Sequence, residues 1–179
     1  FHRYIDIIEP LSLDEAYLDV THSQKCSGSA TWIAQEIRQA IFDELNLTAS
    51  AGVAPLKFLA KIASDMNKPN GQFVIKPNEV SEFIKTLSLN KIPGVGKVTQ
   101  EKLVQMGLLT CQDVQQSSQT VIYQEFGKFG QRLWDFCHGI DIREVEVDRP
   151  RKSLAVENTL LQDINTLAQA ELIIDELYH

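Results

Sequence analysis

Hydrophobic and polar positions follow two periods in the first 76 residues, one typical of strands and one typical of helices. Apolar side chains recur every four residues from Ile33 to Leu45, which predicts an amphipathic helix that begins after the N-cap candidate Ser29. The expected order is two strands in 4–21, this helix, a strand in 48–54, a helix between Pro55 and Pro69, and a strand in 72–75. Such an order predicts an α+β layer in which helices pack on a sheet.

Beyond residue 76 the pattern changes to short helices separated by glycine. Gly107 and Gly139 lie where C-terminal helix caps are expected. Helices are predicted at 79–87, 98–106, 112–115, 120–126 and 128–137. Apolar periodicity is lost and charge becomes dense over 141–152, which indicates a linker. A strand at 153–160 and a helix at 167–177 would then begin another domain.

These patterns predict a chain of four parts. They are an α+β part at 1–76, an all-α part at 77–140, a basic linker at 141–152 and the truncated start of a domain at 153–179. The chain opens without an initiator Met and stops directly after a helical pattern, so we expect a piece of a longer protein.

Charge, cysteine spacing and the length of apolar runs exclude several classes of protein. The net charge of −7 argues against a nucleic-acid partner unless the cations are concentrated in one region. Three cysteines without paired spacing predict ordinary thiols in a reducing compartment, not a zinc site or a disulfide framework. No run approaches the ~20 apolar residues that span a bilayer, and no signal peptide is visible. We therefore expect a cytoplasmic protein with no membrane partner.

Two adjacent acids, Asp14 and Glu15, lie in an otherwise apolar strand context. Neighbours on a regular strand point to opposite faces, so both reach one metal ion only if the chain bends there, as at a hairpin. Leu11 and Leu13 are expected to bury the base of such a site. Carboxylates are ligands that Mg²⁺ prefers, and two such ions support phosphoryl transfer. The alternative is a solvated turn.

Three lysines, Lys57, Lys61 and Lys68, are spaced by four and seven residues. On a helix they would form one basic face opposite the apolar face that contains Phe58 and Ile62. A concentrated basic edge in an acidic protein is a candidate phosphate contact, and the alternative is a solvated lysine face. Lys68 stands at the helix exit, where a rigid turn would aim its ammonium.

A glycine hairpin, Gly94-Val95-Gly96-Lys97, precedes a predicted helix. Glycine permits a tight turn and close approach to a ligand, and a helix N-terminus offers free N–H groups to an anion. A helix-hairpin-helix of this kind binds the DNA backbone without reading sequence. The basic pair Arg151 and Lys152 ends the linker and would extend a positive track. The alternative is a plain helical turn.

These motifs, in this order and spacing, resemble those of the Y-family DNA polymerases. The matching segments are Ser12–Asp19 (SLDEAYLD), Lys57–Asp65 (KFLAKIASD) with Lys68–Gly71 (KPNG), and Ile92–Gly96 (IPGVG). The resemblance implies the C-terminal half of a catalytic palm, a helix-hairpin-helix thumb and the start of a little-finger domain. It also implies template-directed, error-prone translesion synthesis on primer-template DNA with dNTPs.

The resemblance also implies roles for individual residues. Asp14 and Glu15 would bind two Mg²⁺ ions, Lys68 would contact the triphosphate, and Ser12 would lie near the primer end with Lys61. Residues Gly94, Val95, Gly96, Lys97, Arg151 and Lys152 would contact DNA. A sliding clamp would dock on a C-terminal region that this chain lacks, and the enzyme would act as a monomer. The family's first catalytic Asp and its fingers are expected to precede this chain, so the chain alone is predicted to be inactive.

Three other functions stay open at this stage. A non-catalytic helix-hairpin-helix module would bind DNA and leave the acid pair as a turn. A nucleotide cyclase would share a palm-like layer, although it has no need for a duplex grip. A purely structural interaction protein would leave the glycine hairpin and Lys68 unexplained.

Overall fold

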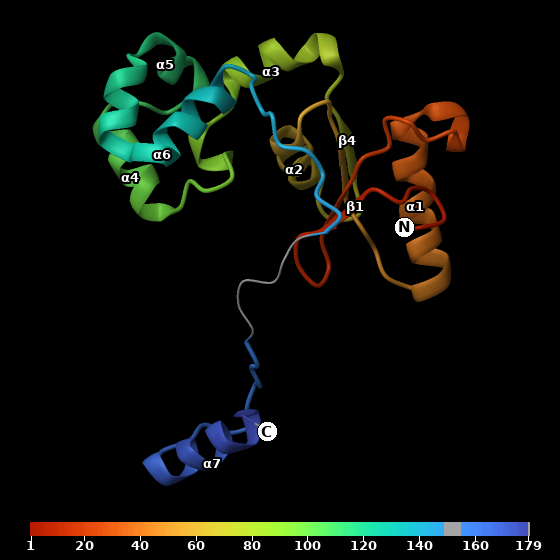
Figure 1. Cartoon of the computed structure of the whole chain (residues 1–179), viewed down its shortest axis with the longest axis vertical. Helices are drawn as coiled ribbons and strands as arrows, with labels where there is room; N and C mark the ends of the chain where they lie inside the picture. The colour runs from red at the N-terminus through yellow and green to blue at the C-terminus, as the bar shows by residue number, and fades with distance from the viewer. Residues whose placement is uncertain (149–154, 179) are drawn as a thin grey trace. The chain divides into compact units, whose positions relative to one another are not determined.

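The computed structural model describes residues 1–148 and 155–178. The chain divides into two compact units, Phe1–Val147 and Asp148–His179. The elements of the first unit are β1 (Ile8–Pro10), β2 (Ala16–Leu18), α1 (Ala30–Leu45), β3 (Ala51–Val53), α2 (Lys57–Met66), β4 (Gln72–Val74), α3 (Val80–Thr86), α4 (Lys97–Gln105), α5 (Cys111–Gln116) and α6 (Gln119–Cys137). This order confirms the predicted mixture of an α+β part followed by short helices (Figure 1).

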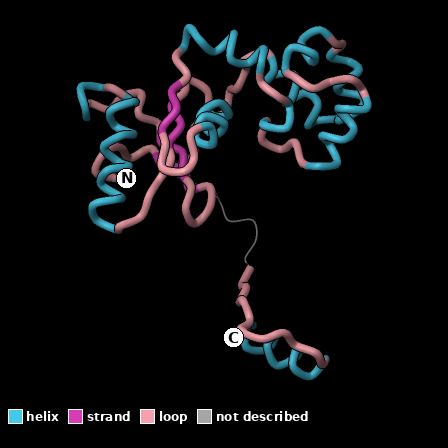
Figure 2. Tube along the Cα trace, turned by 180° about the vertical axis from the view of Figure 1, so that it is seen from behind, coloured by secondary structure: helices cyan, strands magenta, loops and turns pink. Residues whose placement is uncertain are grey.

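Four short strands form the β part. β1 pairs antiparallel with β2, and β3 pairs parallel with β4. The strands thus form two two-stranded sheets in the described residues, and not the single sheet that we expected, because strand order along a chain does not fix which strands share a ladder. α1 and α2 lie on opposite sides of the strands (Figures 1 and 2).

Helix α1 begins where the sequence predicts. The Ser29 hydroxyl accepts a hydrogen bond from the backbone N–H of Trp32, so Ser29 is the N-cap. Asn46, in the left-handed region at φ 54°, ends the helix. Ile33 on its inner face is 1% exposed, which confirms the predicted apolar side.

The helical part, α3 to α6, packs around one core that it shares with α2. The rings of Phe58 on α2 and Phe136 on α6 stack with centroids 4.4 Å apart. Gly127 breaks α6 with φ 58°, which is why the sequence predicts two helices there. The buried core residues are Phe58, Leu59, Ile62, Ala63, Ile75, Ile84, Leu87, Leu89, Ile92, Leu103, Leu108, Cys111, Val114, Ile122, Leu133, Phe136 and Cys137.

Residues 141–147, which we call the returning segment, run back along α2 towards β1 (Figure 1). They belong to the predicted linker, but backbone and side-chain bonds hold them on the first unit. The Asp141 carboxylate accepts the N–H of Phe58 at 2.9 Å and so caps α2, whose N-cap Leu56 offers no side-chain bond. The first unit consequently extends to Val147.

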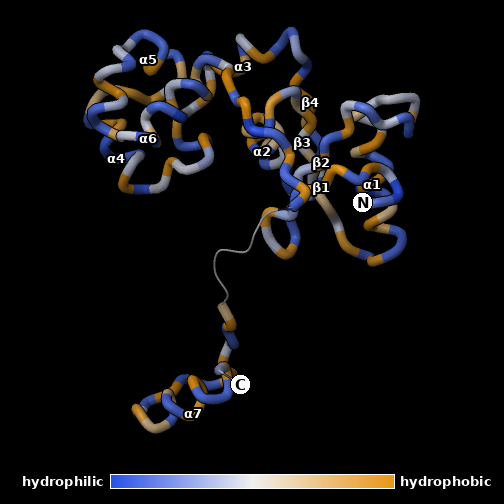
Figure 3. Tube along the Cα trace, in the orientation of Figure 1, coloured by the Kyte–Doolittle hydropathy of each residue, from blue (hydrophilic) through white to orange (hydrophobic). Residues whose placement is uncertain are grey.

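The second unit contains one helix, α7 (Leu167–Tyr178), in its described residues. This helix confirms the predicted one, and its apolar residues Leu172 and Ile174 are exposed. Hydrophobic and hydrophilic positions both occur along it (Figure 3). The predicted strand at 153–160 is not present over 155–160, because no neighbouring strand offers a ladder there in the described residues. No described helix is both long and apolar enough to cross a membrane.

Candidate active site and DNA-binding hairpin

The acid pair lies on a tight hairpin turn between β1 and β2. The backbone N–H groups of Leu11 and Ser12 both donate to the carbonyl of Glu15, at 2.8 Å and 3.3 Å, and so close the turn. The chain therefore bends where two adjacent carboxylates require a bend to serve one site. Leu13, however, is fully exposed and does not bury the base of the site, since the turn directs it outward.

Each carboxylate of the pair has a hydrogen-bond partner among the described residues. The Ser12 hydroxyl donates to Asp14 Oδ1 at 2.7 Å. Lys61 Nζ, from α2, donates to Glu15 Oε1 at 2.5 Å. Helix α2 and the hairpin turn thus bring Ser12, Asp14, Glu15 and Lys61 into one cluster, although Lys61 and Glu15 are far apart in sequence.

Carboxylate oxygens on this turn suit a hard divalent cation, and the ammonium of Lys61 already places positive charge beside Glu15. Asp14 and Glu15 therefore fit as two ligands of such an ion. Within 1–148 and 155–178, no group of three or more His, Cys, Asp or Glu residues could hold a metal ion. The two acids are consequently part of a ligand set that needs further donors.

Lys68 lies just beyond α2, where the turn is held in place by α1. The Arg38 guanidinium donates to the carbonyl of Asn70 at 2.6 Å and to its side chain at 3.0 Å. A side chain at Gly71 would place its Cβ 1.8 Å from the carbonyl oxygen of Asn67, so only glycine fits there. These contacts make the turn rigid, as the sequence predicts.

The Lys68 ammonium is within electrostatic reach of the acid pair. Its hydrogen bond to Asp65, with N–O distance 2.6 Å, is the main cause that raises the pKa of Lys68 above its ordinary value. The charges of Glu15 and Asp14 raise this pKa further. Lys68 is half exposed, so its ammonium is accessible to an anionic ligand near the acids.

The prediction that Lys57 belongs to an exposed basic face of α2 is wrong. The Lys57 side chain is 8% exposed, and it forms a buried ion pair with Glu9, which is 7% exposed. Lys57 also donates to the carbonyl of Glu144 at 2.8 Å and lies 4.9 Å from the centre of the Tyr17 ring. Because this ammonium is enclosed by protein, it is unavailable to a phosphate.

The glycine hairpin lies between a short 3₁₀ helix, Leu89–Lys91, and α4. Gly94 adopts φ 97°, and a Cβ there would lie 2.8 Å from the ring of Phe129. Val95 packs against the core, whereas Gly96 and Lys97 are exposed at the start of α4. The hairpin thus presents backbone and one ammonium beside a helix N-terminus, an arrangement that suits a phosphate.

Other cations of the helical part differ in their availability. Lys102 is paired with Glu125 at 2.9 Å and lies over the ring of Phe126, so it stabilises the fold beside Gly127. Arg132 lies 5.3 Å from the centre of the Phe129 ring, next to the hairpin, and makes no ion pair with a described residue. Its proximity to Gly94 arises from folding, and local sequence does not reveal it. Arg151 and Lys152 lie outside the described residues.

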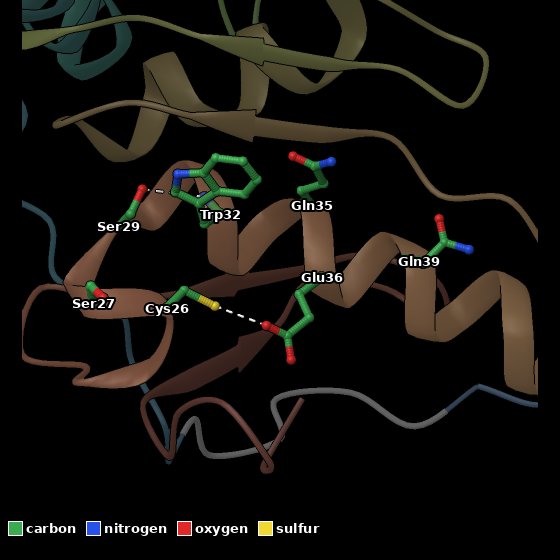
Figure 4. Close-up of a pocket in the computed structure, with 7 residues that line it drawn as sticks. All are labelled: Cys26, Ser27, Ser29, Trp32, Gln35, Glu36 and Gln39. Atoms are coloured by element: carbon green, nitrogen blue, oxygen red, sulfur yellow. Dashed lines mark hydrogen bonds between the residues drawn. The ribbon is translucent and has the colours of Figure 1, made fainter.

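A shallow pocket on α1 contains none of these residues. The Cys26 thiol donates to Glu36 at 2.9 Å there, and this bond is the main cause that raises the pKa of Cys26 (Figure 4). Trp32 forms part of its lining.

The chain is similar to known proteins in both sequence and fold. The impB/mucB/samB family matches residues 1–65, and the thumb domain of DNA polymerase iota matches residues 90–141. A Dbh–Dpo4 Y-family polymerase chimera superposes with TM-score 0.78 at 35% identity and covers 84% of this chain and 44% of the chimera. DinB from Sulfolobus solfataricus gives TM-score 0.75 at 36% identity, over 81% of this chain and 43% of that protein.

The chain belongs to the Y-family of DNA polymerases, and its two matched regions are parts of the palm and the thumb. Its curated relatives are named DNA polymerase IV. The relative from Glaesserella parasuis is 72% identical, that from Actinobacillus pleuropneumoniae serotype 3 is 70% identical, and each match covers 99% of this chain and 50% of the relative. The chain thus spans about half the length of the curated relatives it matches.

Proposed function

We propose that the complete protein is a template-directed translesion DNA polymerase, to which this chain contributes half of the palm and the thumb. The observation that carries this proposal is the hairpin turn that holds Asp14 and Glu15 together, within electrostatic reach of Lys68. The relatives named DNA polymerase IV support it, as does the insertion ternary complex of the Dbh polymerase, which is 36% identical over 81% of this chain.

In the proposed reaction, the 3′-oxygen of a primer attacks the α-phosphorus of a dNTP, a P–O bond forms and pyrophosphate leaves. Two Mg²⁺ ions, with Asp14 and Glu15 among their ligands, would supply Lewis-acid stabilisation of the attacking and leaving oxygens. Lys68 offsets charge on the departing phosphates. Ser12 orients the Asp14 carboxylate near the primer end.

The thumb would hold the duplex behind the primer terminus. Gly94, Val95, Gly96 and Lys97 bind one backbone phosphate through the start of α4, and Arg151 and Lys152 add contacts further along the chain. We further propose that the complete protein acts in the cytoplasm as a monomer. It docks on a sliding clamp through a region outside this chain.

Templated primer extension by the complete protein tests this proposal. Asp14→Asn is expected to abolish extension while DNA affinity stays nearly unchanged, because the variant loses a metal ligand and no DNA contact. Extension that survives in Asp14→Asn would show that Asp14 is no ligand. If neither protein extends a primer but both bind DNA in a salt-sensitive way, a non-catalytic helix-hairpin-helix module is the better description.

This chain alone is predicted to bind primer-template DNA without extending it. The reason is that its described residues contain no third acid beside Asp14 and Glu15. Extension by the isolated chain above that of a mock preparation would contradict this prediction.

A further inference from the structure

Two ion pairs connect α2 to the hairpin that carries the acids. Lys57 and Lys61, one turn apart on α2, pair with Glu9 on β1 and with Glu15 at the end of the turn. Similar lysines on one helix face thus contact two acids on one hairpin. The inner pair, Lys57 with Glu9, is buried. The outer pair, Lys61 with Glu15, is partly exposed, with side-chain exposures of 26% and 37%.

The inner pair fixes the hairpin against the helix. Glu9 accepts bonds from Lys57 and from the backbone N–H of Glu146, the latter at 2.8 Å, and it is the register partner of Tyr17 on β2. Lys57 approaches the Tyr17 ring as well. Both strands are therefore held at a fixed position along α2, and this places Lys61 one turn further on, beside Glu15.

The outer pair engages only one of the two oxygens of the Glu15 carboxylate in the described residues. Lys61 bonds Oε1 of the Glu15 carboxylate, and no residue of the described chain donates to Oε2. An ammonium that holds one carboxylate oxygen fixes the direction in which the other oxygen points. Groups that orient a metal ligand in this way contribute strongly to metal affinity.

We propose that Lys61 is a positioning residue, which orients the Glu15 carboxylate so that its Oε2 is presented to a catalytic divalent cation. The inference rests on the proposed function, since it takes Glu15 as a metal ligand. It replaces the expectation that Lys61 contacts the primer. One of the three N–H bonds of the Lys61 ammonium is already directed at Glu15, with an N–O distance of 2.5 Å, so the structure gives this lysine a partner among the acids.

The test compares Lys61→Met and Lys61→Arg in the complete protein. Met keeps the length of the side chain and removes its charge, whereas Arg keeps a cation that can bond the carboxylate. Binding of Mn²⁺ to the protein with primer-template DNA, followed by electron paramagnetic resonance, gives a readout that is independent of turnover. Lys85→Met is the matched control, because Lys85 is paired with Glu82 at 3.1 Å far from the acids in sequence.

Lys61→Met is expected to weaken Mn²⁺ binding by about tenfold, the lower end of the effect of residues that support metal ligands. It should also raise the Mg²⁺ concentration that gives half-maximal extension. Lys61→Arg should keep most of the wild-type Mn²⁺ affinity and a Mg²⁺ requirement close to that of the wild type. Lys85→Met should change neither quantity. Thermal denaturation and DNA affinity of each variant show whether folding is intact.

Wild-type Mn²⁺ affinity in a folded Lys61→Met variant would overturn the inference. If that variant instead loses DNA affinity and the salt dependence of binding falls by about one phosphate contact, Lys61 is a DNA contact. Failure of the proposed function is distinguishable, because the wild-type protein would then extend no primer, whereas failure of this inference leaves wild-type extension intact.

Discussion

Gly94 and Gly96 stand two residues apart in the thumb hairpin, yet their surroundings differ. Gly94 has φ 97°, and a Cβ there would clash with Phe129, whereas Gly96 has φ −86° and a Cβ there would meet nothing within 4 Å. From the sequence alone, both are turn glycines. Only Gly94 is required by the fold, and the open space at Gly96 is available to a ligand.

Gly94→Ala is therefore expected to destabilise the chain by about 1–3 kcal/mol, because it combines a left-handed residue with a clash. Gly96→Ala should cost less, about 0.5–1 kcal/mol, because Gly96 is the N-cap of α4 and alanine is a poorer N-cap than glycine. It should still weaken DNA binding, since its methyl group stands where a phosphate would approach. Thermal denaturation and fluorescence anisotropy with labelled duplex measure the two effects. Equal loss of stability in both variants would contradict this assignment.

At the scale of elements, α2 shows what a one-dimensional pattern can and cannot predict. Its bounds, its apolar face and the turn after it follow from local sequence, since Phe58, Leu59 and Ile62 repeat at helical spacing. The role of Lys57 does not, because its partner Glu9 is 48 residues away. The pairing of Lys61 with Glu15 is likewise not predictable from local sequence, because the two residues are 46 positions apart. Local spacing indicates only a solvated or phosphate-binding lysine at this position.

The β elements show the same limit. The sequence locates each strand of the first unit but not its partner, because ladder pairing depends on contacts between distant residues. The predicted strand at 153–160 has the right composition and no neighbour to pair with in the described chain. Helices, whose hydrogen bonds are local, are predicted more closely, including the break at Gly127.

The buried ion pair between Lys57 on α2 and Glu9 on β1 predicts an effect on the stability of the fold. Lys57→Met should cost about 3–5 kcal/mol, because it leaves the Glu9 carboxylate buried without its cation. Lys57→Met combined with Glu9→Gln should recover much of that loss, since no buried charge remains. Urea denaturation monitored by tryptophan fluorescence measures both.

Lys68→Met is the matched control for this experiment. Its pair with Asp65 is half exposed, so the change should cost less than about 1 kcal/mol. A loss of stability in Lys57→Met as small as that in Lys68→Met would show that the Glu9 pair does not stabilise the fold.

At the scale of the whole molecule, the palm and the thumb share one core around α2, and two of the contacts between them have residues in common. One is the stack of Phe58 on Phe136, and the other is the returning segment, in which Asp141 caps α2 and bonds Arg143 through both carboxylate oxygens at 2.7 Å. Arg143 in turn lies 4.9 Å from the centre of the Phe136 ring. The contacts share residues, so they are expected to form together.

This arrangement predicts a dependence of stability on pH. Burial alone would raise the pKa of Asp141, but the bonds from Arg143 and from the N–H of Phe58 outweigh it and lower that pKa below its ordinary value of 3.8. A depressed folded-state pKa adds stability above the unfolded-state pKa, and this stability is lost as pH falls through the folded-state value. Asp141→Asn should lower the melting temperature near neutral pH.

The difference between wild type and Asp141→Asn should shrink as the solution is made acidic. Thermal denaturation over a series from neutral to acidic pH measures it. Asp113→Asn is a useful control, because the pKa of Asp113 is also lowered, but by local bonds from the N–H groups of Leu109 and Thr110 within the thumb. A melting-temperature difference for Asp141→Asn that stays constant with pH would contradict the assigned role of this carboxylate.

The returning segment has a mechanical consequence. The chain enters the thumb from Ile75, whose N–H is bonded to the carbonyl of Val53, and it leaves the thumb through residues that are again bonded to the palm. The thumb is thus tethered to the palm both where the chain enters it and where the chain leaves it, and its core is shared with α2. Displacement of the thumb from the palm would therefore have to break both tethers and open that core.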